Sequence, residues 1–163
     1  PPALTCHQSI RANIMMEFCC EVSMPTKSRY NTNLASEFYA LSMLYRRGFD
    51  ANLTLGNKKS VDIVVTLSNG RLVTIDVKGL AGKTGWPVDN LKKGSRGHYY
   101  VFISFLDDIE NPSLLPEVYI VPSVHLRHIR YNAPSGRKLV RLATLRKKGS
   151  EYKDAWGLLR SGK

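Results

Sequence analysis

Cysteine is absent from this 163-residue chain after residue 20. The three cysteines, Cys6, Cys19 and Cys20, all lie near the start. Neither a disulfide framework nor a thiolate zinc site can therefore belong to the fold of the remaining chain. A chain of this kind suits a reducing compartment, and we expect a cytoplasmic location.

The chain also lacks the apolar run of about 18 residues that a membrane-spanning helix needs. It has no Gly-x-Ser-x-Gly motif, which excludes the usual serine-nucleophile turn. Residues 1–23 lack the charged, apolar and small-residue order of a secretory signal, and they show no clean periodicity. We expect residues 1–23 to be a disordered upstream extension, and residues 24–163 to form one domain without a membrane partner.

Acidic residues are few, with 13 Asp and Glu against 24 Lys and Arg, and the net charge is +11. Residues 125–163 hold eleven of the basic residues and only two acidic ones. Such a balance favours a polyanionic partner, with nucleic acid the default, although a cationic solvated surface is the alternative. The basic C-terminal segment, residues 125–163, is the better candidate for phosphate contacts.

The pattern of apolar residues predicts an α/β domain. Asn31, Thr32 and Asn33 can cap a helix that runs to about Arg47. Its expected buried stripe is Leu34, Phe38, Leu41, Leu44 and Tyr45, and Glu37 falls on that stripe. Further along, we expect strands over 50–55, 61–67, 71–78, 99–106 and 117–121, a Gly/Lys-rich loop over 79–97, a short helix over 123–130 and a terminal helix over 152–159.

Charged residues interrupt two of these strands, and the turn between them fixes how they face. If Ser68-Asn69-Gly70 forms a three-residue loop with Gly70 left-handed, Asp62 pairs with Asp76 on one sheet face. A two-residue loop would put the two aspartates on opposite faces. In the three-residue register Lys78 joins Asp76 by alternation along the strand. Because adjacent carboxylates repel unless a cation lies between them, this register favours a metal site.

Other motifs are weaker. Gly79 to Thr84 is not a nucleotide-binding P-loop, because its glycine spacing is wrong and Gly85-Trp86-Pro87 prevents the helix that should follow. His125 and His128 fit a solvated basic face better than a metal site. The residues we expect to touch nucleic acid are the basic side chains of the loops and C-terminal segment, with Trp86 as a stacking aromatic: Lys58, Lys59, Lys83, Trp86, Lys92, Lys93, Arg146, Lys147 and Lys148.

Helix-borne Glu37, then Asp62 after a turn, then Asp76-Val77-Lys78 on the next strand, resembles the PD-(D/E)xK nuclease superfamily over roughly residues 30–106. The order is similar to that of archaeal Holliday junction resolvases and other restriction-endonuclease-like proteins. The resemblance implies an αβββαβ core with a central mixed sheet flanked by helices. Val61 stands where a Pro is common, no Gln follows on a next helix, and that second helix is not located between 88 and 96.

The resemblance also implies a chemistry. Asp62, Asp76 and the Val77 carbonyl would bind Mg²⁺ or Mn²⁺, and Glu37 would act through water. Lys78 would position the attacking water and offset negative charge, although a plain ion pair between Lys78 and Asp76 is the alternative.

The leading hypothesis is therefore a Mg²⁺-dependent deoxyribonuclease, an endonuclease that hydrolyses DNA phosphodiester bonds, with branched DNA among its expected substrates. The alternatives are a catalytically inactive nucleic-acid-binding protein of the same fold, and an interaction protein that binds no nucleic acid. The family resemblance also suggests a homodimer.

Overall fold

The computed structural model describes residues 28–54, 61–89 and 94–161. The expected extension 1–23 and four of the expected DNA contacts, Lys58, Lys59, Lys92 and Lys93, lie outside the described residues. The elements are α1 (Arg29–Tyr45), β1 (Asp50–Leu53), β2 (Ile63–Thr66), β3 (Leu72–Leu80), β4 (Gly85–Pro87), β5 (His98–Ser104), β6 (Glu117–Pro122), η1 (Ser123–His125), α2 (Leu126–Ile129), β7 (Arg130–Asn132), β8 (Lys138–Arg141), α3 (Leu142–Lys148), η2 (Ser150–Tyr152) and α4 (Leu158–Ser161).

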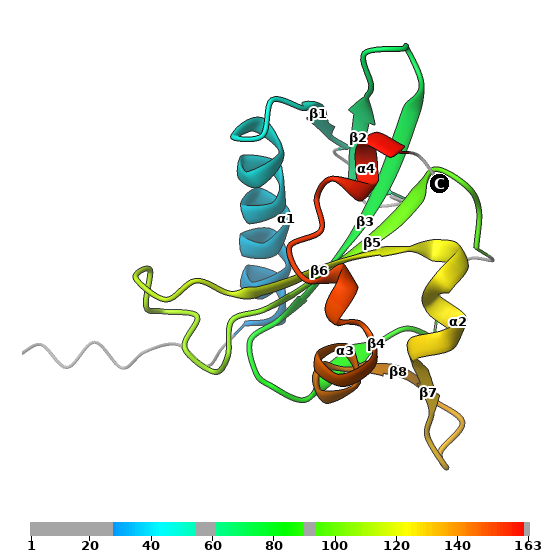
Figure 1. Ribbon diagram of the computed structural model, residues 1–163. Coiled ribbons are helices and arrows are strands. Elements are labelled where there is room, and N and C mark those ends of the chain that lie inside the picture. The colour runs from blue at the N-terminus through cyan, green and yellow to red at the C-terminus, as the bar shows by residue number, and fades with distance from the viewer. Residues whose placement is uncertain (1–27, 55–60, 90–93, 162–163) are drawn as a thin grey trace, which may run out of the picture.

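A five-stranded sheet in the order β1-β2-β3-β5-β6 forms the centre of the molecule (Figure 1). β3 and β5 are parallel and the other neighbours are antiparallel, so the sheet is mixed. α1 covers one face of this sheet, and residues of that face form one apolar cluster with Ala40 and Leu44 of α1. The prediction of an α/β fold with a central mixed sheet flanked by helices is confirmed.

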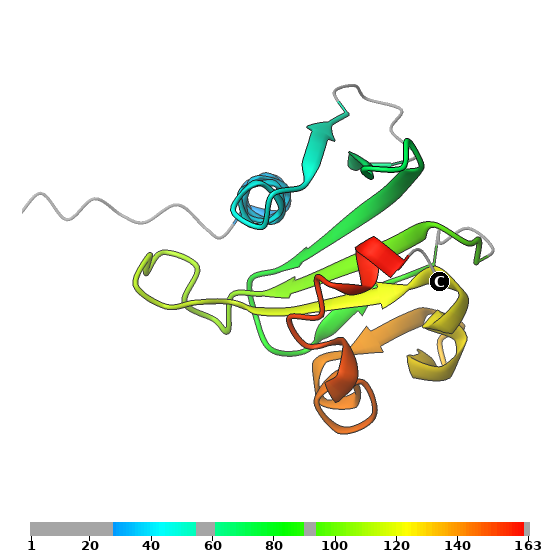
Figure 2. The ribbon, with the colours of Figure 1, turned by 45° about the horizontal axis from the view of Figure 1, so that its top comes forward.

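The opposite face is covered by a second sheet in the order β4-β8-β7, together with α3 (Figure 2). Trp86, Val140, Leu142 and Leu145 are buried there against Phe102 of β5 in a second apolar cluster. This second sheet was not predicted from the sequence. In the described part of the crossover between β3 and β5, the chain forms β4 rather than the second helix of the αβββαβ order.

The predicted buried stripe of α1 is confirmed only in part: Leu44 is buried and Leu41 packs against the core, as expected. Ser28 is the N-cap, three to five residues before the predicted caps, and the buried residues are Thr32, Ser36, Ala40 and Leu44. Phe38 and Tyr45, which were expected inside, are each 56% exposed. The helix turns its small side chains to the sheet because it approaches β3 closely at Gly79, where larger side chains would not fit.

The predicted terminal helix is also wrong as a continuous element. Only η2 and α4 are helical, because the Asp154 N–H donates to the Val118 carbonyl at 3.0 Å and Asp154 has a positive φ of 49°. The chain is thereby tied to β6 instead of continuing a helix. Trp156 and Leu159 are nevertheless buried against the core.

Among the described residues, no helix has both the length and the apolar character needed to cross a bilayer.

Gly79 to Ala should destabilise the fold. A Cβ at residue 79 would overlap the Ser36 hydroxyl and lie 2.8 Å from the Thr32 carbonyl oxygen. Overpacking of this kind typically costs about 1–3 kcal/mol, which lowers Tm by roughly 3–10 °C in a protein of this size. Thermal unfolding followed by circular dichroism measures the change.

Gly157 to Ala is the matched control, because a Cβ there meets nothing within 4 Å. Its Tm should stay close to that of the wild type. If Gly79 to Ala also leaves Tm unchanged, the close contact between α1 and β3 does not constrain the fold.

Candidate functional site

The turn between β2 and β3 brings two carboxylates together, as predicted. The Leu67 N–H donates to the Arg71 carbonyl and the Gly70 N–H to the Leu67 carbonyl, both at 2.8 Å, and Gly70 has φ 78°. The resulting register pairs Ile63 with Ile75, and Asp62, immediately before β2, lies next to the Asp76 carboxylate. The three-residue loop that the sequence favoured is confirmed.

Asp62 is held in place by the backbone of β3. Its N–H donates to the Ile75 carbonyl at 2.9 Å, and its Oδ2 accepts the Val77 N–H at 2.7 Å. Val77 was expected to offer its carbonyl to a metal; the contact that the structure describes is a separate one, made by its N–H. Val77 therefore acts here as a residue that positions the Asp62 carboxylate.

The electrostatics of the pair are unfavourable without a cation. Burial raises the pKa of Asp62, and the adjacent Asp76 carboxylate raises it further, against the Val77 N–H and Lys78, which lower it. Lys78 Nζ forms an ion pair with Asp76 Oδ1, and the Asp76 side chain is 19% exposed. One ammonium thus faces two carboxylates in a half-buried setting, which leaves the cluster of Asp62, Asp76 and Lys78 with a net negative charge when all three are ionised.

Glu37 does not complete this cluster. It is half-buried on α1, one turn beyond Asn33 on the same side of the helix. Over the described ranges, no three Asp, Glu, His or Cys side chains are grouped so that they could hold a metal ion. Two of the three predicted carboxylates are therefore brought together, and the third is not.

A groove of about 670 Å³ opens beside Asp76 and Lys78. We call it the site groove. One wall is the first turns of α1 and the other is β4 with the two residues that follow it. The charged and amide side chains of this lining are Arg29, Asn33, Asp76, Lys78, Asp89 and Arg137. Arg29, Asn33, Asp89 and Arg137 were not predicted, because they come from segments that only the fold brings together.

Trp86 was expected to stack on a base, and this prediction is wrong. Its side chain is 1% exposed, its ring packs 5.2 Å from that of Phe102, and its Nε1 donates to the Ile103 carbonyl at 3.3 Å. The apolar face of the second sheet needs a large side chain at this position. The indole ring is therefore part of the core.

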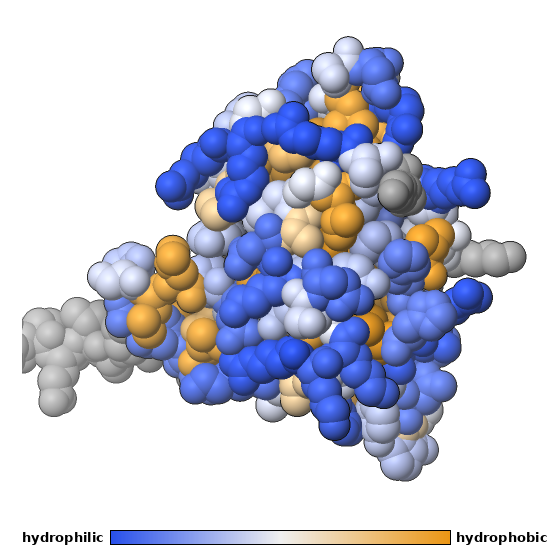
Figure 3. All heavy atoms as spheres, in the orientation of Figure 1, coloured by the Kyte–Doolittle hydropathy of each residue, from blue (hydrophilic) through white to orange (hydrophobic). Residues whose placement is uncertain are grey.

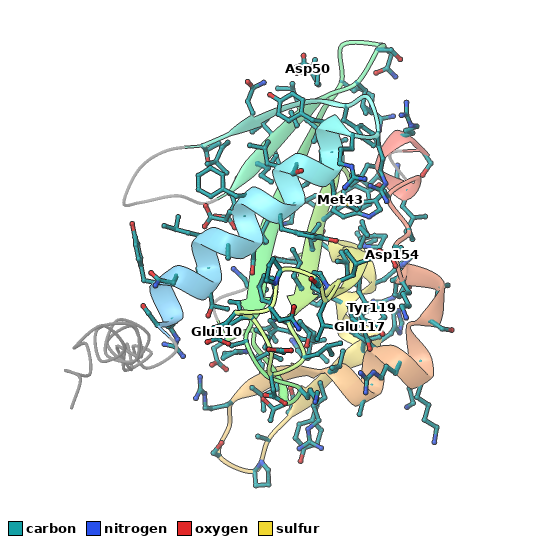
Figure 4. The ribbon with its side chains drawn as sticks, turned by 90° about the vertical axis from the view of Figure 1, so that its left-hand side faces the viewer. Met43, Asp50, Glu110, Glu117, Tyr119 and Asp154 are labelled. Atoms are coloured by element: carbon teal, nitrogen blue, oxygen red, sulfur yellow. The ribbon has the colours of Figure 1, made fainter. Side chains whose placement is uncertain are left out.

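The other expected basic contacts that the structure describes, Lys83 and Arg146 to Lys148, lie apart from the site groove. Lys83 pairs with Asp107 at 3.4 Å, and both side chains are more than half exposed. Arg146 binds Glu117 through two hydrogen bonds of 2.6 and 3.1 Å. Glu117 lies beside Tyr119 on β6 (Figure 4) and accepts its hydroxyl hydrogen bond at 2.9 Å.

This cluster of Glu117, Tyr119 and Arg146 links α3 to β6. Burial and the neighbouring Glu117 raise the pKa of Tyr119 to about 12. Arg146 forms an ion pair with Glu117. Lys147 and Lys148 remain exposed at the end of α3. The surface over α3 is strongly hydrophilic (Figure 3).

The donor set of Asp62 and Asp76 fits a hard divalent cation. Mg²⁺ prefers oxygen ligands, keeps several waters, and is usually bound by only one or two protein carboxylates together with substrate phosphate. Two adjacent carboxylates beside an open groove meet that requirement.

No protein-family model and no curated protein sequence matches this chain. Among solved structures, the bacterial homing endonuclease I-Ssp6803I is similar to it, with a TM-score of 0.51 and 17% sequence identity. The alignment covers 82% of this chain and 93% of that one. At this identity the likeness concerns the fold alone.

Asp62 to Asn should raise Tm at pH 7 in the presence of EDTA. The folded-state pKa of Asp62 lies above its ordinary value of 3.8, so the folded protein favours the protonated carboxyl. Stability is therefore lost as pH rises from the ordinary pKa through the folded-state pKa. Above the folded-state pKa the wild type is therefore less stable than the variant. The difference in Tm between the two proteins should vanish once the pH falls below the ordinary pKa, near pH 3.5. The asparagine keeps an oxygen that can accept the Val77 N–H.

Asp89 to Asn is the control of opposite sign. The Lys138 backbone N–H lowers the pKa of Asp89, and Arg137 lowers it further, so its charge contributes stability above the ordinary pKa that is lost as pH falls. This substitution should not raise Tm at pH 7. An Asp62 to Asn protein that is less stable than the wild type at pH 7 would contradict the unfavourable charge pair.

Proposed function

We propose that this chain is a metal-dependent endonuclease of the PD-(D/E)xK type that hydrolyses DNA phosphodiester bonds. The observation that carries the proposal is the convergence of Asp62, Asp76 and Lys78 at the end of β2 and in the middle of β3. The likeness of the fold to a homing endonuclease and the net charge of +11 support it.

Asp62 and Asp76 would hold the cation. A bound Mg²⁺ or Mn²⁺ would supply the Lewis acid that phosphodiester hydrolysis needs at neutral pH. The Val77 N–H fixes Asp62 and the strand register fixes Asp76, so both carboxylates are oriented before any ligand arrives. Such preorganisation avoids a reorganisation cost during the reaction.

Lys78 would stabilise the scissile phosphate. Its ammonium now contacts Asp76, and it lines the site groove where a scissile phosphate would lie. Once Asp76 is neutralised by a cation, the ammonium is available to stabilise negative charge that develops on the phosphate oxygens. Arg29 lines the same groove and supplies positive charge that attracts the DNA backbone, while Arg137, also in the lining, is paired with Asp89.

The second candidate is a DNA-binding protein of the same fold without catalysis. The position of Glu37 favours it, because this carboxylate does not join Asp62 and Asp76 in the described structure. Cleavage of plasmid DNA in Mg²⁺ separates the two candidates. A panel of plain duplex, nicked, flapped and four-way-junction DNA then tests whether branched DNA is the substrate.

Asp76 to Asn and Lys78 to Ala should each lower Mg²⁺-dependent cleavage by roughly 10²-fold or more, because each removes charge used at the transition state. DNA binding in EDTA should stay near that of the wild type, since few ground-state contacts are lost. Glu37 to Gln should be milder. Single-turnover cleavage of supercoiled plasmid measures the rates.

The control for this series is Asp107 to Asn, which removes an exposed carboxylate that pairs with Lys83 outside the site groove. Its cleavage rate should stay within a few-fold of the wild-type rate. If both Asp76 to Asn and Lys78 to Ala cut DNA at the wild-type rate, the nuclease site lies elsewhere or is absent.

Mg²⁺ should raise Tm at pH 7, because it binds the folded chain between Asp62 and Asp76. With Mg²⁺ at ten times its Kd the gain is about 1.4 kcal/mol, or roughly 3–6 °C. Asp62 to Asn and Asp76 to Asn should each abolish the rise, and Asp107 to Asn should keep it. An equal rise in all four proteins would mean that Mg²⁺ binds elsewhere.

A further inference from the structure

The hairpin of β7 and β8 projects from the second sheet at the bottom of Figure 1. Its loop repeats the geometry of the β2–β3 turn. The Ala133 N–H donates to the Arg137 carbonyl at 2.7 Å, the Gly136 N–H donates to the Ala133 carbonyl at 2.9 Å, and Gly136 has φ 78°. Residues 134–138 are all exposed. The hairpin is thus a tightly closed two-stranded ribbon with a tip in solvent.

The charge of the hairpin has one sign. Residues 130–141 contain Arg130, Arg137, Lys138 and Arg141 and no acidic residue. The register pairs Asn132 with Lys138 and Arg130 with Val140, so Arg130, Asn132 and Lys138 share one face with Val140, whose side chain is buried in the apolar cluster. All three side chains are exposed, because β7 is the edge strand and the tip extends beyond the apolar cluster.

The hairpin is tied to the site groove. Asp89 accepts the Lys138 N–H at 2.6 Å and the Arg137 Nε at 3.3 Å, and the Val88 N–H donates to the Lys138 carbonyl at 2.8 Å. Asp89 and Arg137 line the groove beside Asp76 and Lys78. A ligand bound along the hairpin would therefore continue directly into the groove.

We propose that the β7–β8 hairpin enters the major groove of duplex DNA, where Arg130, Asn132 and Lys138 contact base edges and confer sequence preference. The major groove is about 12 Å wide and admits a two-stranded ribbon. Arginine and lysine pair with guanine O6 and N7, and asparagine pairs with adenine, in that groove. The inference rests on the proposed function in taking DNA as the ligand.

Duplex DNA fits better than a single strand. Single-strand binding depends on exposed aromatic rings on which bases stack. The Trp86 ring is buried, and one face of Tyr131, the aromatic residue of the hairpin, is covered by the Arg141 guanidinium at 3.7 Å. The exposed aromatic rings Tyr30, Phe38 and Tyr45 belong to α1, not to the hairpin. A helix in the groove is a weaker alternative, since α3 has only seven residues and Arg146 within it is bound to Glu117.

The test starts with selection of binding sites by the wild-type protein from a pool of randomised 30-base-pair duplexes in EDTA, where cleavage does not occur. We expect a preferred sequence to be enriched. Arg130 to Ala combined with Lys138 to Ala should weaken binding of that duplex by roughly 10- to 100-fold or more, and Asn132 to Ala by about 5- to 100-fold. Binding of a scrambled duplex should fall much less.

The charge-matched control is Lys147 to Ala combined with Lys148 to Ala, which also removes two positive charges. It should weaken selected and scrambled duplexes alike and leave the preferred sequence unchanged. Methylation of guanine N7, which lies in the major groove, should block wild-type binding at the contacted positions. Tm confirms that each variant is folded, and Asn132 to Ala alone carries the test if the double hairpin variant is not.

Three results would overturn the inference: no enriched sequence, equal losses for the two double variants, or a single strand bound as tightly as the duplex. Each is distinct from failure of the nuclease proposal. A wild-type protein that selects a duplex but does not cut it in Mg²⁺ keeps the hairpin inference and loses the nuclease. If the wild type cuts DNA in Mg²⁺ but the hairpin variants bind the selected duplex as tightly as the wild type, the nuclease proposal stands and the hairpin inference fails.

Discussion

The close contact of α1 with β3 at Gly79 is the constraint on which the rest of the structure depends. Ser36 is fully buried at this contact, its hydroxyl donates to the Thr32 carbonyl at 2.7 Å, and no side chain fits at residue 79. The contact lies one residue after Lys78, so it brings the first turns of α1 beside Asp76 and Lys78. The position of Arg29 and Asn33 in the site groove follows from it.

The second sheet has the complementary role on the other face. Trp86 and Val140 are buried against β5, which holds β4 and β8 at a fixed place over the five-stranded sheet. Beyond this apolar cluster the two layers leave the site groove between them. The hairpin therefore begins where the groove ends, because β8 belongs to both the buried cluster and the exposed ribbon.

The two glycine turns explain how much could be predicted from the sequence. Ser68-Asn69-Gly70 lies between strands rich in Val and Ile, so the register that joins Asp62 and Asp76 could be deduced. Pro134-Ser135-Gly136 forms the same turn, but its strands have three and four residues, too few for a periodic pattern. The face of α1 could not be deduced either, because apolar side chains occur on two sides and packing against Gly79 decides between them.

The arrangement of charge distinguishes the cluster of Asp62, Asp76 and Lys78 from an ordinary structural ion pair. A structural pair is neutral, as with Glu117 and Arg146. Here two carboxylates share one ammonium; burial raises the pKa of Asp62, and the adjacent Asp76 carboxylate raises it further. Arg29 and Arg137 lie along the groove rather than against the carboxylates. Negative charge is thus concentrated where Asp62 meets the middle of β3, and Arg29 adds positive charge along the groove, the distribution that a cation and a phosphate backbone would each complement.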